Sequence, residues 1–392
     1  MPWSETTPMD QKIQFMSDYL RQNLSMSELC QLYSISRKTA YKWVDRYLRM
    51  GPAGLEDRSR RPHHAHNATP PNIVEAILES RRKHPSWGGK KLLALVRRGH
   101  PDWSLPAKTT ACEILKRHGM VLKQRRRRII GHPGRPTAPM YAPNDLWCAD
   151  FKGQFKTGDG AYCYPLTVTD ARSRYLLGCQ ALPSTSVAGS KPVFTRLFKE
   201  FGLPKRIRTD NGVPFATTTL ARLSSLSAWW VRLGILPDLI EPGRPDQNGR
   251  HERMHKTLKA ETTRPPAGSN AAQQRRFNPW RDEFNNVRPH EALDQETPAS
   301  CYQPSPRQMP DKIPQLEYPD RFEVRYVSGN GGIRWNHKWV NVSTVCIGDY
   351  VGFEEIDNGI WNVYYGMLKL GRFDERTMRI EDAFGRLKRR NV

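Results

Sequence analysis

The first third of the chain has hydrophobic residues at helical spacing, interrupted by short polar breaks. Residues 25–28, Ser-Met-Ser-Glu, have the spacing of a capping box, in which a serine hydroxyl and a glutamate carboxylate bind the free amides at a helix start. The apolar face of this helix is expected to contain Leu29, Leu32 and Tyr33. A polar break at residues 34–35 predicts where the helix ends.

A second helix is predicted directly after this break, with Ser36 as its N-cap. Helix-turn-helix domains place the beginning of their second helix in the major groove, so the pattern predicts a DNA-binding domain over residues 1–62. A plain helical hairpin with a solvated basic face is the alternative. The inward positions are expected to be Ala40, Trp43, Val44 and Tyr47. The outward positions, which would face DNA, are Arg37, Lys38, Thr39, Tyr41 and Lys42.

A second helical unit is predicted over residues 69–122. It starts at Pro71, with Ile73 and Ile77 behind it, and continues to a later helix that begins near Lys108 and Thr109. By the same reasoning this unit is a second helix-turn-helix domain, with Lys108 and Thr109 as candidate DNA contacts. An ordinary helical bundle has a similar pattern and remains the alternative.

A basic linker over residues 123–140 follows the helical units. Its arginines are expected to follow the DNA phosphates and to make binding depend on salt, although a solvated linker would have the same composition. These arginines are Arg125, Arg126, Arg127 and Arg128.

From residue 146 the pattern changes to short β-rich runs separated by turns and helices. The predicted order is three strands, a helix, a strand, a helix, a strand and a helix. The strands are expected at 146–151, 162–168, 175–179, 205–209 and 238–240, and the helices at 187–201, 217–233 and 249–260; a further helix is expected at 279–286.

The last part of the chain returns to alternating β patterns split by Gly and Asn turns. These runs predict a small β-barrel over residues 318–384. The strands are expected at 322–327, 332–335, 338–342, 350–353 and 361–365.

The net charge of the chain adds information about its binding partner. The net charge of +23 and the pI of about 9.9 indicate a polyanionic partner, and positions 1–140, with 26 basic and 11 acidic residues, carry +15 of that charge. The seven scattered cysteines are expected to be reduced, buried thiols, because no Cys-x-x-Cys pair indicates a zinc site. With no secretory signal or apolar span in the pattern, a cytoplasmic protein associated with the bacterial nucleoid is expected.

Three acidic residues stand out in this basic chain: Asp150, Asp210 and Glu252. Carboxylates that converge repel one another and take up protons unless cations lie between them. Mg²⁺ prefers such oxygen ligands, and two ions can serve cleavage and joining of phosphodiesters. Each acid also has an ordinary alternative: a strand end, a turn, or for Glu252 an ion pair with Lys256.

Three longer motifs, at residues 208–215, 242–259 and 285–293, resemble transposases of bacterial insertion sequences that have a retroviral-integrase-type catalytic core. The resemblance implies a ribonuclease-H-like α/β core over residues 141–303, with a mixed five-stranded sheet flanked by helices. It also implies that Asp150, Asp210 and Glu252 are the catalytic and metal-binding triad, with two Mg²⁺ ions that Mn²⁺ can replace.

The spacing of the last two acids departs from the family pattern. The family usually has fewer residues there than the 41 that separate Asp210 from Glu252, so Asp246 is a rival. Glu252 is preferred because Asp246 has turn-forming neighbours, whereas Glu252 is one turn into a predicted helix. Three basic residues flank Glu252 at helical spacing and are candidate contacts to the DNA backbone: Arg253, Lys256 and Lys259.

The sequence therefore predicts a DNA transposase that binds the terminal inverted repeats of its element and performs metal-dependent strand cleavage and strand transfer. Its partners are expected to be double-stranded DNA, both the element ends and the target, and further copies of the same chain on that DNA. The alternatives are a hydrolysis-only nuclease on the same fold and a DNA-binding regulator with an inactive core.

Overall fold

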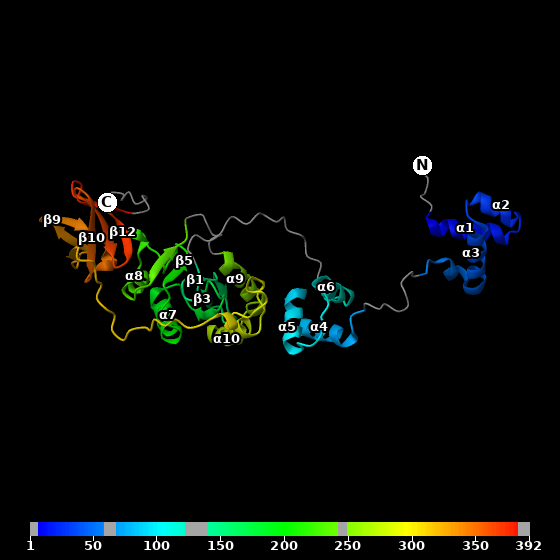
Figure 1. The fold of residues 1–392 in the computed structure, drawn as a ribbon, viewed down its shortest axis with the longest axis horizontal. Helices are drawn as coiled ribbons and strands as arrows, with labels where there is room; N and C mark the ends of the chain where they lie inside the picture. Colours follow the sequence, from blue (N-terminus) through cyan, green and yellow to red (C-terminus); the bar gives the residue numbers. More distant parts are fainter. Residues whose placement is uncertain (1–6, 59–67, 122–139, 242–248, 383–392) are drawn as a thin grey trace. The chain divides into compact units, whose positions relative to one another are not determined.

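The computed structural model describes residues 7–58, 68–121, 140–241 and 249–382. The chain divides into two compact units, Met1–Thr69 and Pro70–Val392 (Figure 1). Among the described residues, no helix is both long and apolar enough to cross a membrane.

The first unit is a bundle of three helices and a 3₁₀ turn. The helices are α1 (Pro8–Leu20), α2 (Met26–Leu32) and α3 (Arg37–Met50), followed by η1 (Gly51–Leu55). The predicted capping box of α2 and the Ser36 cap of α3 are both present. Leu32 is an exception to the predicted apolar face, because it is the last residue of α2 and is 63% exposed. The core combines residues of all four elements: Phe15, Met16, Leu29, Cys30, Ala40, Trp43, Val44 and Leu55.

The second unit begins with another three-helix cluster: α4 (Pro71–Lys83), α5 (Gly89–Gly99) and α6 (Lys108–Arg117). Pro71 is the first residue of α4, and Ile73 and Ile77 are buried, as predicted. The rest of the cluster core comes from all three helices and the connecting segment, with Leu78, Trp87, Leu92, Val96, Ala111, Ile114 and Leu115.

Residues 147–239 form a mixed sheet, as predicted, and its five main strands have the order β4-β3-β1-β5-β6. The strands are β1 (Trp147–Phe151), β3 (Tyr162–Asp170), β4 (Leu176–Leu182), β5 (Arg206–Thr209) and β6 (Leu236–Leu239). A sixth strand of two residues, β2 (Phe155–Lys156), was not predicted and pairs with the beginning of β3. The pair β1–β3 is antiparallel, whereas β1–β5 and β5–β6 are parallel.

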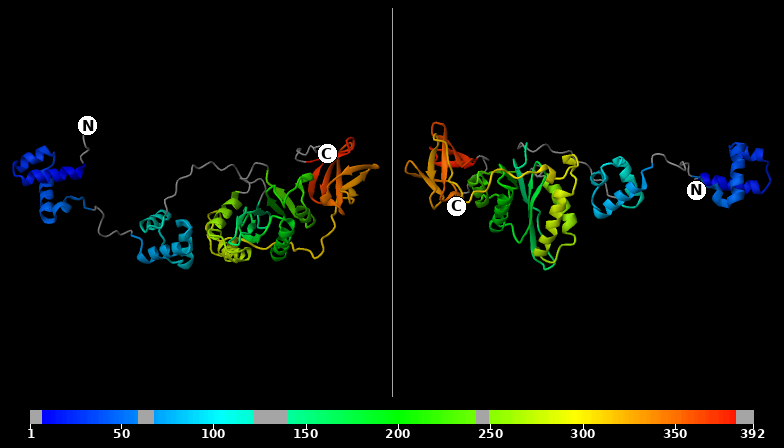
Figure 2. Two further views of the ribbon diagram at one scale, coloured as in Figure 1. Left: turned by 180° about the vertical axis from the view of Figure 1, so that it is seen from behind. Right: turned by 60° about the horizontal axis from the view of Figure 1, so that its bottom comes forward.

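Helices cover both faces of this sheet (Figures 1 and 2). One face packs on α7 (Val187–Phe201) and α8 (Ser225–Arg232), and the other packs on α9 (Gly249–Thr262) and α10 (Asn270–Asn286). Alternate residues of one strand therefore face opposite helix layers. On β3, Leu166 and Val168 belong to the α7–α8 core, whereas Cys163 belongs to the α9–α10 core.

Two predicted helix boundaries were wrong. The helix expected over 217–233 begins only at Ser225, because the hydroxyls of Thr217 and Thr219 donate to the carbonyl of Leu223 and Ser224 caps the helix. The helix expected from Pro279 begins nine residues earlier at Asn270, capped by Ser269, and contains the proline in its interior.

The C-terminal strands form an open five-stranded sheet and a separate hairpin rather than a closed barrel. The sheet has the order β13-β12-β11-β10-β7, and the hairpin is β8–β9. The hairpin lies against both edge strands, β7 and β13, but within 323–382 no ladder joins it to either. These edge strands have only four residues each, which limits further pairing. The strands are β7 (Glu323–Tyr326), β8 (Gly332–Trp335), β9 (Lys338–Asn341), β10 (Tyr350–Asp357), β11 (Ile360–Tyr365), β12 (Leu368–Asp374) and β13 (Arg379–Asp382), of which the last two were not predicted.

All seven cysteines are free thiols. The prediction that they are buried is wrong for Cys112 and Cys301, which are half-buried. Burial raises the pKa of the Cys163 thiol to about 12, so this group remains protonated and unreactive at neutral pH.

Candidate active site

The parallel pairing of β1 with β5 explains how two of the three predicted acids meet. The register pairs Trp147 with Ile207 and Cys148 with Arg208. Continued by two residues, the same register places Asp150 beside Asp210, which directly follows β5. Both side chains then point to the same face of the sheet, because side chains alternate along neighbouring strands in phase.

Contacts around Asp210 fix the end of β5. The amide of Gly212 donates to Oδ1 of Asp210 at 3.2 Å, and the Nδ2 of Asn211 donates to the carbonyl of Ile240 at 2.8 Å. Arg208, which is 3% exposed, binds Oδ2 of Asp238 through Nη2 at 2.7 Å and so ties β5 to β6. Asn211 thus shapes the turn after β5, and Arg208 is paired with Asp238.

The third acid, Glu252, is in the first turn of α9 and is exposed. This helix packs on the sheet through His251, Met254, His255 and Leu258, which are all buried. Glu252 therefore lies beside the packed face of the helix rather than on it. The rival acid, Asp246, and the arginines at 125–128 lie outside the described residues.

The pKa of Asp150 is affected by both of the other predicted acids. Its pKa is raised to about 7, first by burial and then by the negative charge of Asp210, with a smaller contribution from Glu252. The amide of Phe151 and the charge of Lys152 act in the opposite direction. Burial also raises the pKa of Asp210. A buried carboxyl group whose ionisation is opposed by burial and by neighbouring acids is one that a cation would stabilise in its charged form.

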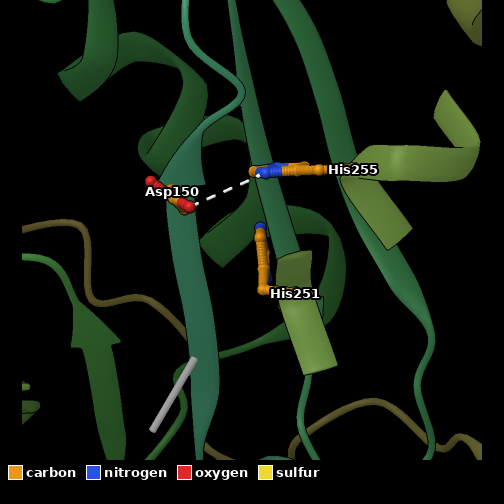
Figure 3. Close-up of side chains that lie close together, drawn as sticks. All are labelled: Asp150, His251 and His255. Atoms are coloured by element: carbon orange, nitrogen blue, oxygen red, sulfur yellow. Dashed lines mark ion pairs between the residues drawn. The ribbon is translucent and has the colours of Figure 1, made fainter. Parts of the chain in front are cut away.

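A network of buried polar groups lies between β3 and α9, next to Asp150. The Oγ1 of Thr167 is 2.6 Å from the Nε2 atoms of both His251 and His255, and 3.1 Å from the carbonyl oxygen of Asp150. The Nδ1 of His251 is 3.1 Å from the Oγ1 of Thr169. The Nδ1 of His255 is 3.7 Å from Oδ2 of Asp150, and Figure 3 shows its imidazole directed at that carboxylate.

These histidines were missed in the sequence, although a signal for them exists. Residues 251–255 read His-Glu-Arg-Met-His, and two histidines four residues apart on a helix with an intervening glutamate are a known zinc-site pattern of metalloproteases. In such a site the two imidazoles converge on the metal. Here both Nε2 atoms converge on the hydroxyl of Thr167, which occupies that point. This contact with Thr167 differs from the arrangement of a zinc protease site. Among the described residues, the group whose potential ligand atoms lie within 4.8 Å of one another is Asp150, His251 and His255, and it does not include Asp210 or Glu252.

The predicted DNA-contact residues are on exposed helix surfaces. In the first unit, Arg37, Lys38, Tyr41 and Lys42 are exposed in the first half of α3, and Thr39 is half-buried. In the second unit, Lys108 and Thr109 are exposed at the start of α6. On α9, three exposed basic residues share the helix with Glu252: Arg253, Lys256 and Lys259.

Models of known families match four parts of the chain. An integrase core domain model matches residues 140–245, and a second integrase core domain model matches residues 233–298. A helix-turn-helix domain model matches residues 11–63, and a homeodomain-like domain model matches residues 39–115.

Similar proteins come from insertion elements and retroviruses. The IS407 uncharacterized 31.7 kDa protein of Burkholderia multivorans is 24% identical over 287 residues, which are 71% of this chain and 90% of that protein. The IS476 uncharacterized 39.2 kDa protein of Xanthomonas euvesicatoria is 29% identical over 45% of this chain and 51% of that protein. The Gag-Pol polyprotein of baboon endogenous virus is 27% identical over 48% of this chain, but this match spans only 11% of the polyprotein.

Among solved structures, the HTLV-2 integrase catalytic core domain in complex with magnesium has 16% identity and a TM-score of 0.33, and covers 41% of this chain and 97% of that one. The intasome of simian T-cell lymphotropic virus in complex with the PP2A regulatory subunit B56 gamma has 15% identity, covers 75% of this chain and 97% of that one, and has a TM-score of 0.36. Integrase-core and helix-turn-helix matches in one chain, with relatives from two insertion elements, show that the chain belongs to the insertion-sequence transposases with an integrase-type core.

Proposed function

We propose that the chain is a DNA transposase that binds the terminal inverted repeats of its element and catalyses strand cleavage and strand transfer. The observation that supports the proposal is the raised pKa of the buried carboxyl of Asp150, which is due first to burial, then to the charge of Asp210, and least to the charge of Glu252. A group of acids of this kind is out of place on a protein of net charge +23 unless it binds cations beside DNA.

The donor set fits a divalent ion. Asp150, Asp210 and Glu252 offer hard carboxylate oxygens, which Mg²⁺ prefers, and Mn²⁺ has similar preferences. We assign the three acids as ligands of two such ions. When bound, the ions supply the positive charge that activates an attacking oxygen and stabilises a leaving 3′-oxygen. Without positive charge, the raised pKa of Asp150 means that this acid is partly protonated at neutral pH.

The protein itself contributes position and charge. The β1–β5 register supports a shared face of the sheet for Asp150 and Asp210, and the third proposed ligand, Glu252, is in the first turn of α9, the helix that packs on the sheet beside Asp150. Arg253, Lys256 and Lys259 on the same helix would bind the phosphates of the DNA that reaches the acids. A water in the attacking position leads to cleavage, and a terminal 3′-hydroxyl in that position leads to strand transfer, without a covalent bond to the protein.

We assign sequence-specific binding of the element ends to helices of the two N-terminal clusters, α1–α3 and α4–α6. The first half of α3 would enter the major groove with Arg37, Lys38 and Lys42, and the start of α6 would contact a second part of the same end. Two ends must be processed together, so the active form is proposed to be a multimer on DNA.

Strand transfer distinguishes this function from hydrolysis alone. The full chain is supplied with a pre-cleaved element end, a target plasmid and Mg²⁺, and the products are separated on a gel. Joined end–target products support the proposal, whereas nicked plasmid without joined products indicates a hydrolysis-only nuclease.

A substitution separates the enzyme from a regulator with an inactive core. Asp210→Asn removes the charge of this acid but keeps its shape, so end binding should be retained and joining should be lost. Joining by the variant at the wild-type rate, with binding unchanged, would refute the assignment of the acids.

A further inference from the structure

The hydroxyl of Thr167 determines which nitrogen of each neighbouring histidine has a proton. A threonine hydroxyl has one proton to donate and two lone pairs to accept with. It makes three contacts here, and one of them is to the carbonyl oxygen of Asp150, which can only accept. The assignment that satisfies all three contacts has Thr167 donating to this carbonyl and accepting from the Nε2–H groups of His251 and His255.

This assignment leaves the Nδ1 atom of each neutral imidazole without a proton. The Nδ1 of His251 accepts from the hydroxyl of Thr169 at 3.1 Å. The Nδ1 of His255 faces Oδ2 of Asp150 at 3.7 Å. Two electron-rich atoms thus point at each other beside a cluster of acids, an arrangement that a positive ion between them would stabilise.

The distance between these two atoms suits a shared metal ion better than a hydrogen bond. A hydrogen bond between nitrogen and oxygen spans about 2.7 to 3.2 Å. Two ligand atoms that are each about 2.1 Å from one cation are about 3.0 Å apart at right angles and about 4.2 Å apart on opposite sides. The observed 3.7 Å lies between these limits.

The position of His255 on α9 agrees with a ligand role. It is three residues after Glu252, so the two side chains lie one turn apart on neighbouring positions of the helix surface. Glu-x-x-His pairs with this spacing supply metal ligands in di-metal carboxylate proteins. Figure 3 shows His255, but not His251, linked to Asp150.

We propose that His255 is a nitrogen ligand, through Nδ1, of the divalent ion held by Asp150, and that it makes this centre favour transition-metal ions over Mg²⁺. The inference rests on the proposed function, which places an ion at these acids. Imidazole nitrogen binds first-row transition ions well, whereas Mg²⁺ strongly prefers oxygen. A purely carboxylate centre would lack this selectivity.

Pulsed electron paramagnetic resonance of the full chain with Mn²⁺ tests the ligand directly, because a bound imidazole nitrogen couples to the electron spin of the ion. The wild-type protein should show this nitrogen coupling, and His255→Gln should lose it. Calorimetry should show that His255→Gln weakens Co²⁺ binding at least about tenfold and Mg²⁺ binding by less than about threefold.

His251→Gln is the matched control. His251 is on the same helix, is also buried and contacts the same hydroxyl, and it too offers a nitrogen within 4.8 Å of Asp150, but the dashed line in Figure 3 joins only His255 to that carboxylate. This variant should keep the nitrogen coupling. The ligand assignment is overturned if the wild-type protein shows no coupling, if His255→Gln keeps it, or if both variants lose it equally.

Asp150→Asn distinguishes failure of this inference from failure of the proposed function. If Mn²⁺ binding is lost in Asp150→Asn but the wild-type signal lacks nitrogen coupling, only the role of His255 is refuted. If Asp150→Asn binds Mn²⁺ as tightly as the wild-type protein, the proposed metal centre and the inference both fail.

Discussion

Helices α3 and α9 have the same length, 14 residues, and both have exposed basic side chains, but they differ in what they bury. The buried positions of α3 are apolar, with Ala40, Trp43 and Val44. Those of α9 include two imidazoles, His251 and His255, which contact the sheet beside Asp150.

This difference indicates which side of each helix has the groups that can act on a partner or a metal ion. In α3 the buried face only stabilises the bundle, so the groups available to a partner are all on the outside. In α9 the buried face is itself polar and connected to a candidate catalytic acid. Changes to α3 should therefore affect DNA affinity, and changes on the inner side of α9 should affect metal binding and catalysis.

The strongest test of this contrast is Asp150→Asn, in the strand that α9 contacts. Loss of a metal-binding carboxylate removes several kcal/mol of transition-state stabilisation, so strand transfer should fall by about a thousandfold or more. Affinity for the element ends, measured by gel shift, should stay within about twofold because α3 is untouched. If Asp150→Asn lost affinity for the element ends tenfold but joined strands at the normal rate, the expected division of roles between α3 and α9 would be contradicted.

The buried imidazole of His251 should make the second unit sensitive to acid. Burial lowers the pKa of this imidazole from its ordinary value of about 6.5 to about 3, so as pH falls the unfolded chain takes up a proton before the folded chain does. The free energy of unfolding should therefore decrease by about a few kcal/mol between pH 6.5 and pH 3.

Urea unfolding with EDTA at pH 7 and pH 4 measures this loss, and His251→Gln should reduce it. His290 and His255, whose pKa values are also lowered, keep part of the acid sensitivity, and the raised pKa of Asp150 acts with the opposite sign in both proteins. Residues 7–58, which include the helices α1, α2 and α3, contain no histidine, so an effect due to histidine should be absent from this three-helix bundle. Equal pH dependence in the variant and the wild-type protein would contradict the burial argument.

The double substitution Lys38→Ala and Lys42→Ala on α3 should weaken end binding about tenfold near 0.15 M salt and lower the salt slope by about 2, because two phosphate contacts are lost. Lys256→Ala with Lys259→Ala removes the same charge from α9 and should reduce joining more than affinity. Similar loss of affinity in both double variants would show that the two helices bind DNA alike.

Ser36→Ala on α3 should have the smallest effect. The Oγ of Ser36 accepts from the amide of Thr39 at 3.2 Å, and loss of such an N-cap costs about 1 kcal/mol. Hydrogen exchange of the α3 amides should become about fivefold faster, whereas exchange in α9 should not change. Ser36→Asp, which keeps an accepting oxygen, should restore slow exchange.

The sequence predicted elements well where local signals agree. The predicted bounds of α7 match the structure, because Ser186 caps its start and Gly202, with a φ of 75°, ends it. The strands that end at or near Asp150 and Asp210 were also predicted, the first from a short apolar run and the second from its place before the Asn-Gly turn. The start of α10 was missed because Pro279, a residue that usually marks a helix start, is in its interior.

The network around Asp150 could not be derived in the same way. Thr167 and His251 are 84 positions apart, and only the packing of α9 on β3 brings them together. The spacing of the two histidines indicates that their imidazoles can converge on one point, but nothing in the sequence identifies a threonine in a distant strand as the group that they contact. The three acids were found because the family motifs mark them, whereas their buried partners have no such mark.

Thr167 also fixes the rotation and the height of α9 above the sheet. Its single oxygen binds two donors from successive turns of the helix, at equal distances of 2.6 Å. A turn of the helix about its axis, or a slide along it, would lengthen at least one of these bonds. The three contacting atoms, one on the strand and two on the helix, thus restrict the rotation of α9. They thereby determine the direction in which the side chain of Glu252 extends from the helix surface.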